Sequence, residues 1–152
     1  MDKLKIAHHF KLVLPAEDFI LTGTFALSQM GFGIKVKDLD IVLINPTQST
    51  LEVLESLEKS NPPKNLLDYP TTLENKRMFR FIHEGIEVDV FIYRDKIPTV
   101  IQTQCGLKIA PLYHIIQAKK VLGRPKDYIQ LLSLSRKIMS DDEFNSYVKN
   151  SF

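Results

Sequence analysis

The most constraining feature of the sequence is a run in which two acidic residues lead into an uninterrupted apolar stretch. Asp38 and Asp40 flank Leu39, and residues 41–44 are all aliphatic. A strand that is buried on both faces has such a continuous apolar body, whereas a half-exposed strand alternates. Successive side chains of a strand point to opposite faces, so Asp38 and Asp40 point to the same side. The run predicts an interior strand that begins with two carboxylates.

A shorter apolar run ahead of it predicts a second strand that leads directly into a helix. Residues 19–21 are apolar, and Gly23 follows them closely. Thr24 is suited to be the N-cap of a helix over 25–30, which Gly31 would end. The predicted order is a strand, a tight turn and a short helix.

Two further β-rich runs, 77–83 and 86–93, are joined by a Glu-Gly pair suited to a tight hairpin turn. Asp89 lies in the second run, on the face opposite to its aliphatic residues. If this run pairs with the strand that holds Asp40, the sheet brings a third carboxylate to the first two.

The rest of the chain is mostly helical by its apolar spacing. Ser49 and Glu52 are spaced as a capping box, which predicts a surface helix. Further helices are predicted over 111–122 and 125–139, each beginning at a proline, and another after Ser140. Together these elements predict an α+β fold with a helical C-terminal segment.

Composition limits the classes of protein that fit. The chain has 152 residues, of which 44% are hydrophobic and 25% charged, and its formal charge is +2. These values are typical of one globular domain, here residues 1–152 with a core over about 18–95 and closing helices over about 111–150. No apolar stretch is long enough to span a membrane. The single Cys105 and the polar start of the chain lead us to expect a reducing, cytoplasmic setting.

Three carboxylates on one face of a sheet repel each other unless a cation lies among them. Each pair about 4 Å apart costs on the order of 1 to 4 kcal/mol. Oxygen ligands of this kind suit Mg²⁺, the ion used in two-metal phosphoryl and nucleotidyl transfer. The alternative is that Asp38 and Asp40 are solvated residues that pair with Lys35 and Lys37.

The order of these features resembles the DNA polymerase beta-type nucleotidyltransferase superfamily. The resemblance rests on Gly23-Thr24 at a helix start, thirteen intervening residues, the pair Asp38-x-Asp40 and the later strand residue Asp89. It covers roughly residues 19–127. Glycine there lets backbone amides approach a phosphate, although Gly-Thr alone fits an ordinary helix start equally well.

The resemblance implies a mixed sheet flanked by helices, two Mg²⁺ ions (or Mn²⁺) and a nucleoside triphosphate donor, with ATP as the first candidate. It implies that Asp38 and Asp40 ligate the metals and that Asp89 binds the second metal and helps to activate the acceptor hydroxyl. Gly23 and Thr24 would contact the β and γ phosphates. Threonine replaces the usual Gly or Ser here and bulky Phe25 follows, which affects expected triphosphate affinity more than metal binding.

A second cue lies in the C-terminal helices. Lys119 falls in the middle of an apolar helical arc, so its ammonium must reach water or an anion. The segment Arg124-Pro-Lys126-Asp127 follows it and resembles small bacterial nucleotidyltransferase-like proteins of abortive-infection and toxin systems. That resemblance implies that Lys119 reaches the triphosphate or the acids and that Asp127 orients Lys119 or Lys126. A purely structural ion pair fits the same residues.

Three functions remain open from the sequence. The first is an enzyme that transfers a nucleoside monophosphate to a hydroxyl of an RNA, a protein or a small molecule. The second is a nucleotide-binding or protein-interaction module with little turnover, such as half of a toxin–antitoxin pair. The third is a structural domain whose acids do not converge. Only 25 residues follow Asp127, so we expect a partner chain, a second copy or an open cleft to present the acceptor. A basic cluster around Arg80 is interpreted as a solvated hairpin face or as a nucleic-acid contact.

Overall fold

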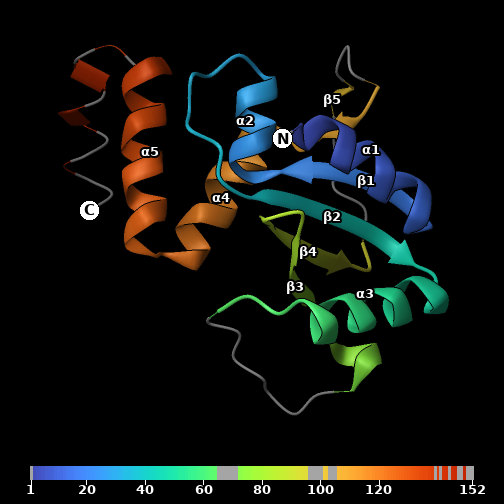
Figure 1. The fold of residues 1–152 in the computed structure, drawn as a ribbon. Helices are drawn as coiled ribbons and strands as arrows, with labels where there is room; N and C mark the ends of the chain where they lie inside the picture. Colours follow the sequence, from blue (N-terminus) through green and yellow to red (C-terminus); the bar gives the residue numbers. More distant parts are fainter. Residues whose placement is uncertain are drawn as a thin grey trace.

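The computed structural model describes residues 2–64, 72–95, 101–102 and 106–138, with residues 140, 142–143, 145–146 and 149 beyond them. Its elements, shown in Figure 1, are α1 (Lys3–Val13), β1 (Ala16–Thr22), α2 (Gly23–Gln29), β2 (Leu39–Pro46), α3 (Gln48–Ser60), the 3-10 helix η1 (Leu73–Asn75), β3 (Met78–His83), β4 (Ile86–Tyr93), β5 (Ile101–Gln102), β6 (Lys108–Ile109), α4 (Leu112–Leu122) and α5 (Pro125–Ile138).

The described strands form one mixed sheet in the order β3-β4-β2-β1-β6-β5. Strand β2 runs parallel to β4 and antiparallel to β1, and β1 runs parallel to β6. Residues 41–44 of β2 are at most 1% exposed. The expected interior strand and the α+β class with a mixed sheet and flanking helices are therefore confirmed.

Helices cover the two faces of this sheet differently. On one face, Phe81 pairs with Val88 and meets the edge of Phe10 from α1, with ring centroids 5.6 Å apart. This face holds the main core, and α3 packs along β3 next to it. Helices α4 and α5 pack against each other and lie on the left in Figure 1. That arrangement leaves the face with Asp40 and Asp89 next to α4.

The hairpin is confirmed, and its turn explains the register. Glu84 and Gly85 both have positive φ, 50° and 79°, as a tight turn of the hairpin type requires. His83 therefore pairs with Ile86, and each pair further along is fixed by this first one.

Two predicted helix starts are wrong by two residues each. Helix α2 begins at Gly23, its N-cap position is Thr22, and Thr24 lies inside the first turn with 7% exposure. Gly23 has φ +66° and turns the chain out of β1 at once, which leaves no linker before the helix. Helix α3 is capped by Thr47, whose hydroxyl accepts a hydrogen bond from the Thr50 amide at 3.2 Å, and not by Ser49.

Several sequence-based expectations fall outside the described residues. They concern Cys105, Met139 and most of the helix expected after Ser140. Of that helix, the structure does show the Ser140 hydroxyl accepting a hydrogen bond from the Glu143 amide at 3.3 Å. No helix in the described ranges is both long enough and apolar enough to cross a membrane.

Candidate active site

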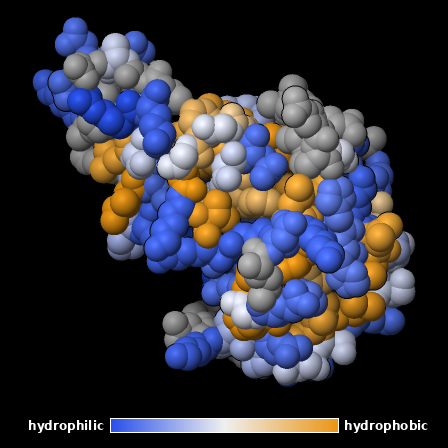
Figure 2. Space-filling model, turned by 45° about the horizontal axis from the view of Figure 1, so that its top comes forward, coloured by the Kyte–Doolittle hydropathy of each residue, from blue (hydrophilic) through white to orange (hydrophobic). Residues whose placement is uncertain are grey.

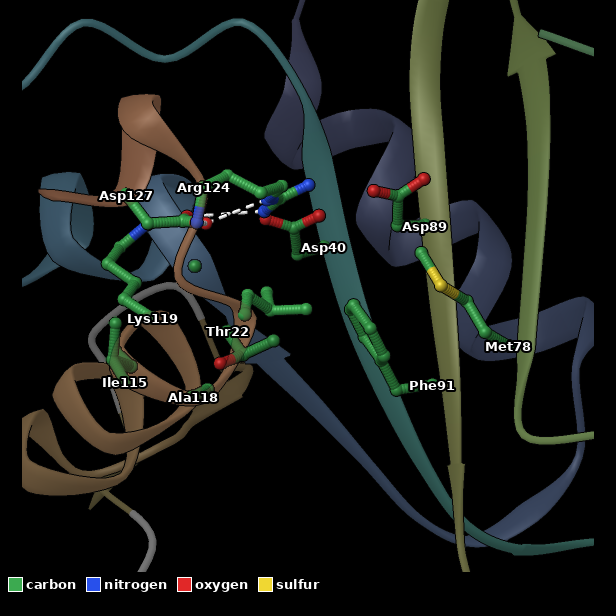
Figure 3. A pocket seen from close by; sticks show the side chains of 12 residues that line it. Thr22, Asp40, Met78, Asp89, Phe91, Ile115, Ala118, Lys119, Arg124 and Asp127 are labelled. Carbon is green, nitrogen blue, oxygen red and sulfur yellow. Dashed lines mark hydrogen bonds and ion pairs between the residues drawn. The ribbon is translucent and has the colours of Figure 1, made fainter. Parts of the chain in front are cut away.

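Asp40 and Asp89 are direct neighbours on adjacent parallel strands. The register of β2 and β4 pairs Asp40 with Asp89, and the register of β1 and β2 pairs Thr22 with Asp40. Paired strands lie about 4.8 Å apart, so the two carboxylates start close together. Figure 3 shows both side chains pointing from their strands toward the same hollow. The predicted convergence of these two acids is thus present.

Gly23 makes room for the Asp40 carboxylate. A Cβ built on Gly23 would lie 2.0 Å from Asp40 Oδ2 and 2.9 Å from its Cγ. Real Cβ atoms essentially never approach another atom that closely. Gly23 is therefore needed for its φ of +66° and also because Asp40 fills the space of a side chain.

Burial and like charges alter the acidity of both carboxyl groups. Burial, followed by the charges of Asp89 and Asp38, raises the pKa of Asp40 to about 7. Burial also raises the pKa of Asp89, and a hydrogen bond and the charge of Arg80 oppose this shift. An uncompensated carboxylate at Asp40 is costly, so the position favours either a proton or a cation.

The hollow next to these acids is a cleft between the sheet and helices α4 and α5. We call it the polar cleft; its lining residues are Thr22, Gly23, Asp40, Met78, Asp89, Phe91, Ile115, Ala118, Lys119, Leu122, Arg124 and Asp127. Its sheet wall carries two acids, and its helical wall carries Lys119 and Arg124. The opposite charges of the two walls explain why a chain of small net charge still has a strongly polarised site.

Asp127 organises the helical wall. It is fully buried, and it accepts hydrogen bonds from the Arg124 backbone amide at 3.1 Å and from Arg124 Nε at 2.7 Å. Lys119 Nζ lies 3.9 Å from Asp127 Oδ1 and donates a hydrogen bond to Gln130. Burial works against its charge, but the hydrogen bonds from Arg124 hold the pKa of Asp127 below its ordinary value. Asp127 thus forms ion pairs with Lys119 and Arg124, whereas Lys126 pairs with Asp38.

Lys119 is buried, and its charge acts on the acids across the cleft. Burial lowers the pKa of Lys119, and the charges of Asp127 and Asp40 counteract that effect. In turn, Lys119 and then Lys126 lower the pKa of Asp40. The sequence had required either solvent or an anion for this ammonium. The structure provides Gln130 and Asp127 directly, with Asp40 further away.

The other predicted site residues line a neighbouring hollow. Thr24, Asp38 and Lys126 contribute to a groove together with Lys35 and Lys37. We call this the lysine groove. Asp38 pairs with Lys126 at 4.0 Å, whereas no ion pair joins it to either lysine of its own segment among the described residues. Thr24 and Asp38 thus line the lysine groove and not the polar cleft, although the charge of Asp38 still raises the pKa of Asp40 and of Asp89.

Arg80 was assigned by sequence to a solvated hairpin face, and that interpretation is wrong. Its guanidinium lies 3.1 Å from Asp89 Oδ1 and 3.4 Å from Glu87 Oε1. The sequence did contain the necessary signal. Once the turn pairs His83 with Ile86, counting along both strands places Arg80 opposite Asp89.

The carboxylates of the polar cleft are chemically suited to bind a divalent cation. Within the described ranges, no three His, Cys, Asp or Glu side chains stand together as a metal site. Mg²⁺, however, is commonly held by one or two carboxylates, with water and phosphate oxygens as the other ligands. Asp40 and Asp89 provide two adjacent carboxylates, and the raised pKa of Asp40 reflects a need for positive charge. The three-carboxylate site with Asp38 remains a prediction.

Comparison with known proteins gives a likeness to a solved structure but none at the level of sequence. No protein-family model and no curated protein matches the sequence. The structure is similar to the crystal structure of a protein from Thermotoga maritima described as "a putative nucleotidyltransferase". The likeness covers 89% of each chain at 16% sequence identity, with a TM-score of 0.48. Similarity at this level does not establish a family for the chain.

Proposed function

We propose that this protein is a metal-dependent nucleotidyltransferase that moves a nucleoside monophosphate from a nucleoside triphosphate to a hydroxyl group. The single observation that carries the proposal is the in-register pair of Asp40 and Asp89 facing Lys119 and Arg124 across one cleft. Adjacent carboxylates suit a divalent ion, and cations opposite them suit a polyphosphate. We propose Mg²⁺ as the ion and ATP as the donor.

In this proposal, Asp40 and Asp89, with Asp38, hold the ion or ions. A bound divalent cation supplies charge neutralisation for the phosphates and makes the acceptor hydroxyl more acidic. The acceptor oxygen forms a bond to the α-phosphorus while the bond between the α-phosphorus and the bridging oxygen breaks, and pyrophosphate leaves. Asp89 accepts the hydroxyl proton. Burial raises its pKa, which makes it a stronger base than an exposed carboxylate.

The remaining site residues act on the triphosphate. Lys119 and Arg124 neutralise its oxygens from the helical wall, and Asp127 positions both cations. Because Gly23 has no side chain, the triphosphate can approach the protein backbone closely on the side of the cleft that carries the acids. Thr24 and Lys126 line the lysine groove, so in this proposal they reach only the far end of the phosphate chain.

Binding and transfer are tested separately. We expect ATP with Mg²⁺ to bind the wild type in calorimetry and Asp40→Asn and Asp89→Asn to lose metal-dependent binding while circular dichroism shows them folded. α-Labelled ATP offered with separate RNA, protein and small-molecule fractions should then label one fraction, with release of pyrophosphate. A wild-type protein that binds neither Mg²⁺ nor ATP would contradict the proposal.

A second candidate is a nucleotide-binding or interaction module with little turnover, as in a toxin–antitoxin pair. The pairing of Arg80 with Asp89 favours it, since the guanidinium neutralises a carboxylate that the enzyme needs free. ATP binding without any labelled product in the three fractions, unchanged in Asp89→Asn, would support the module over the enzyme.

A further inference from the structure

A second pocket adjoins the polar cleft on the same face of the sheet. We call it the apolar pocket. Its floor is formed by Val42 of β2 and by Phe91 and Tyr93 of β4, and its wall by His114 and Gln117 of α4. None of its lining residues is acidic, lysine or arginine. It therefore lies beside a strongly charged site but suits a different chemical group.

The apolar pocket presents rings and uncharged polar atoms. Phe91 and Tyr93 follow Asp89 along β4 at every second residue, so all three point to one face. His114 stands edge-on to Tyr93 with ring centroids 5.9 Å apart. Burial lowers the pKa of His114, which favours the neutral form of its ring. Aromatic walls with neutral hydrogen-bonding groups favour a flat, uncharged ring that carries donors and acceptors at its edge.

Polar groups in this pocket are available to a ligand. Among the described residues, the Gln117 amide and the Tyr93 hydroxyl have no hydrogen-bond partner, and Gln117 is exposed. An amide offers both a donor and an acceptor. Val121 at the rim is 84% exposed, and Figure 2 shows such hydrophobic residues standing at the surface between hydrophilic ones. A ring placed here would cover apolar surface and gain hydrogen bonds.

The two hollows are continuous. Thr22, Phe91, Ala118 and Leu122 line both of them. Figure 3 shows Thr22 and Phe91 below the two acids, and Thr22 is the register partner of Asp40 on the neighbouring strand. The Thr22 hydroxyl makes no capping hydrogen bond to helix α2. One molecule with a charged end and a ring can therefore occupy both hollows, with its linking sugar at Thr22.

We propose that the apolar pocket holds the nucleobase of the nucleoside triphosphate whose phosphates occupy the polar cleft. This inference rests on the proposed function and adds the position of the base, between α4 and strands β2 and β4. A nucleobase is a flat uncharged ring with an edge of donors and acceptors, and its phosphates are attached at the distance of one sugar. The Gln117 amide and the His114 ring then contact the edge of the base.

Calorimetry with two ligands tests the inference. ATP has a base, whereas inorganic tripolyphosphate has only the charged chain. We compare wild type, Gln117→Trp, which fills the mouth of the pocket, and Gln117→Ala, which removes the amide. Tyr113→Ala is the matched control, because Tyr113 is exposed on the same helix and does not line the pocket. Mg²⁺ is present throughout, and thermal melts show which variants are folded.

We expect Gln117→Trp to weaken ATP binding by about tenfold or more and Gln117→Ala by about two- to tenfold. Tripolyphosphate affinity should stay unchanged in both, and the control should bind both ligands as the wild type does. If Gln117→Trp does not fold, Gln117→Ala decides on its own. Unchanged ATP affinity in the folded variants overturns the base position and leaves the proposed function intact. If the wild type binds neither ligand, both proposals fail.

Discussion

The carboxylate of Asp40 lies against the Cα of Gly23, so closely that a Cβ at residue 23 would come within 2.0 Å of Asp40 Oδ2. A turn glycine and a strand acid, seventeen residues apart in the chain, therefore share one space. The resemblance had linked Gly23 to phosphate contact. The contact with Asp40 gives this glycine an additional role, which is to permit the acid to adopt its buried position.

Gly23→Ala should therefore cost more than backbone strain alone. An alanine at positive φ costs roughly 1 to 2 kcal/mol, and displacement of Asp40 adds to that. The matched control is Gly31→Ala, because Gly31 also has positive φ but has nothing within 4 Å of an added Cβ. Chemical denaturation should show Gly23→Ala to be the more destabilising by about 1 to 3 kcal/mol. In the double variant Gly23→Ala/Asp40→Ala, most of that excess should disappear; an additive result would contradict the contact.

The raised pKa of Asp40 predicts that the metal-free protein loses stability as the pH rises. Asp40 has a pKa of about 7 when folded and an ordinary value of 3.8. Between these values the unfolded chain releases the proton first, so stability from this group declines with pH and levels off above about 7. Asp40→Asn should remove the decline and stabilise the metal-free protein at pH 8 by on the order of 2 to 4 kcal/mol. A variant that is less stable than wild type at pH 8 would refute this.

The same group predicts a pH-dependent response to metal. Mg²⁺ must compete with the Asp40 proton below pH 7 but not above it. We expect a larger increase in melting temperature with Mg²⁺ at pH 8 than at pH 6 in the wild type, and no such difference in Asp40→Asn. Equal increases at both pH values would mean that Asp40 is not a metal ligand.

Arg80 should act as the cation for Asp89 when no metal is bound. Its guanidinium neutralises Asp89 and Glu87, so Arg80→Gln leaves the buried carboxylate of Asp89 beside the partly exposed carboxylate of Glu87. We expect a loss of about 1 to 3 kcal/mol in the free energy of unfolding. Mg²⁺ should recover more stability in this variant than in wild type, because an ion then replaces the missing charge. Arg77→Gln is the control, since Arg77 is exposed on the same segment and, among the described residues, its guanidinium donates a hydrogen bond only to the Glu74 carbonyl. Equal recovery in both variants would argue against Arg80 as the cation that neutralises Asp89.

Asp127 should be more important for stability than an acid on the surface. It is fully buried and binds Arg124 through three hydrogen bonds. Asp127→Asn removes the charge that two cations require, and we expect a loss of about 2 kcal/mol or more. Asp18→Asn, which breaks the solvent-accessible pair with Lys108, should cost no more than about 1 kcal/mol. Similar losses in denaturant titrations would show that burial of Asp127 contributes little.

Much of the fold was readable from local patterns. The apolar run after Asp40 could only be an interior strand, and the Glu84-Gly85 turn determined the hairpin register. Helix starts were less certain, because Thr22, Thr24, Thr47 and Ser49 are all suitable caps. Only the tertiary structure selected Thr22 and Thr47 as the N-cap positions.

The sequence by itself determined which residues within each strand share a face, because the period of a strand is local and fixes the direction of every second side chain. The tertiary structure decided which charges meet. It brought Lys119 and Arg124 to face Asp40 and Asp89 across one cleft, and it put Thr24 and Asp38 into the neighbouring lysine groove. These pairings depend on how strands and helices cross in space. Electrostatic attraction acts over a few ångströms between segments that lie far apart in the chain, and no local pattern encodes it.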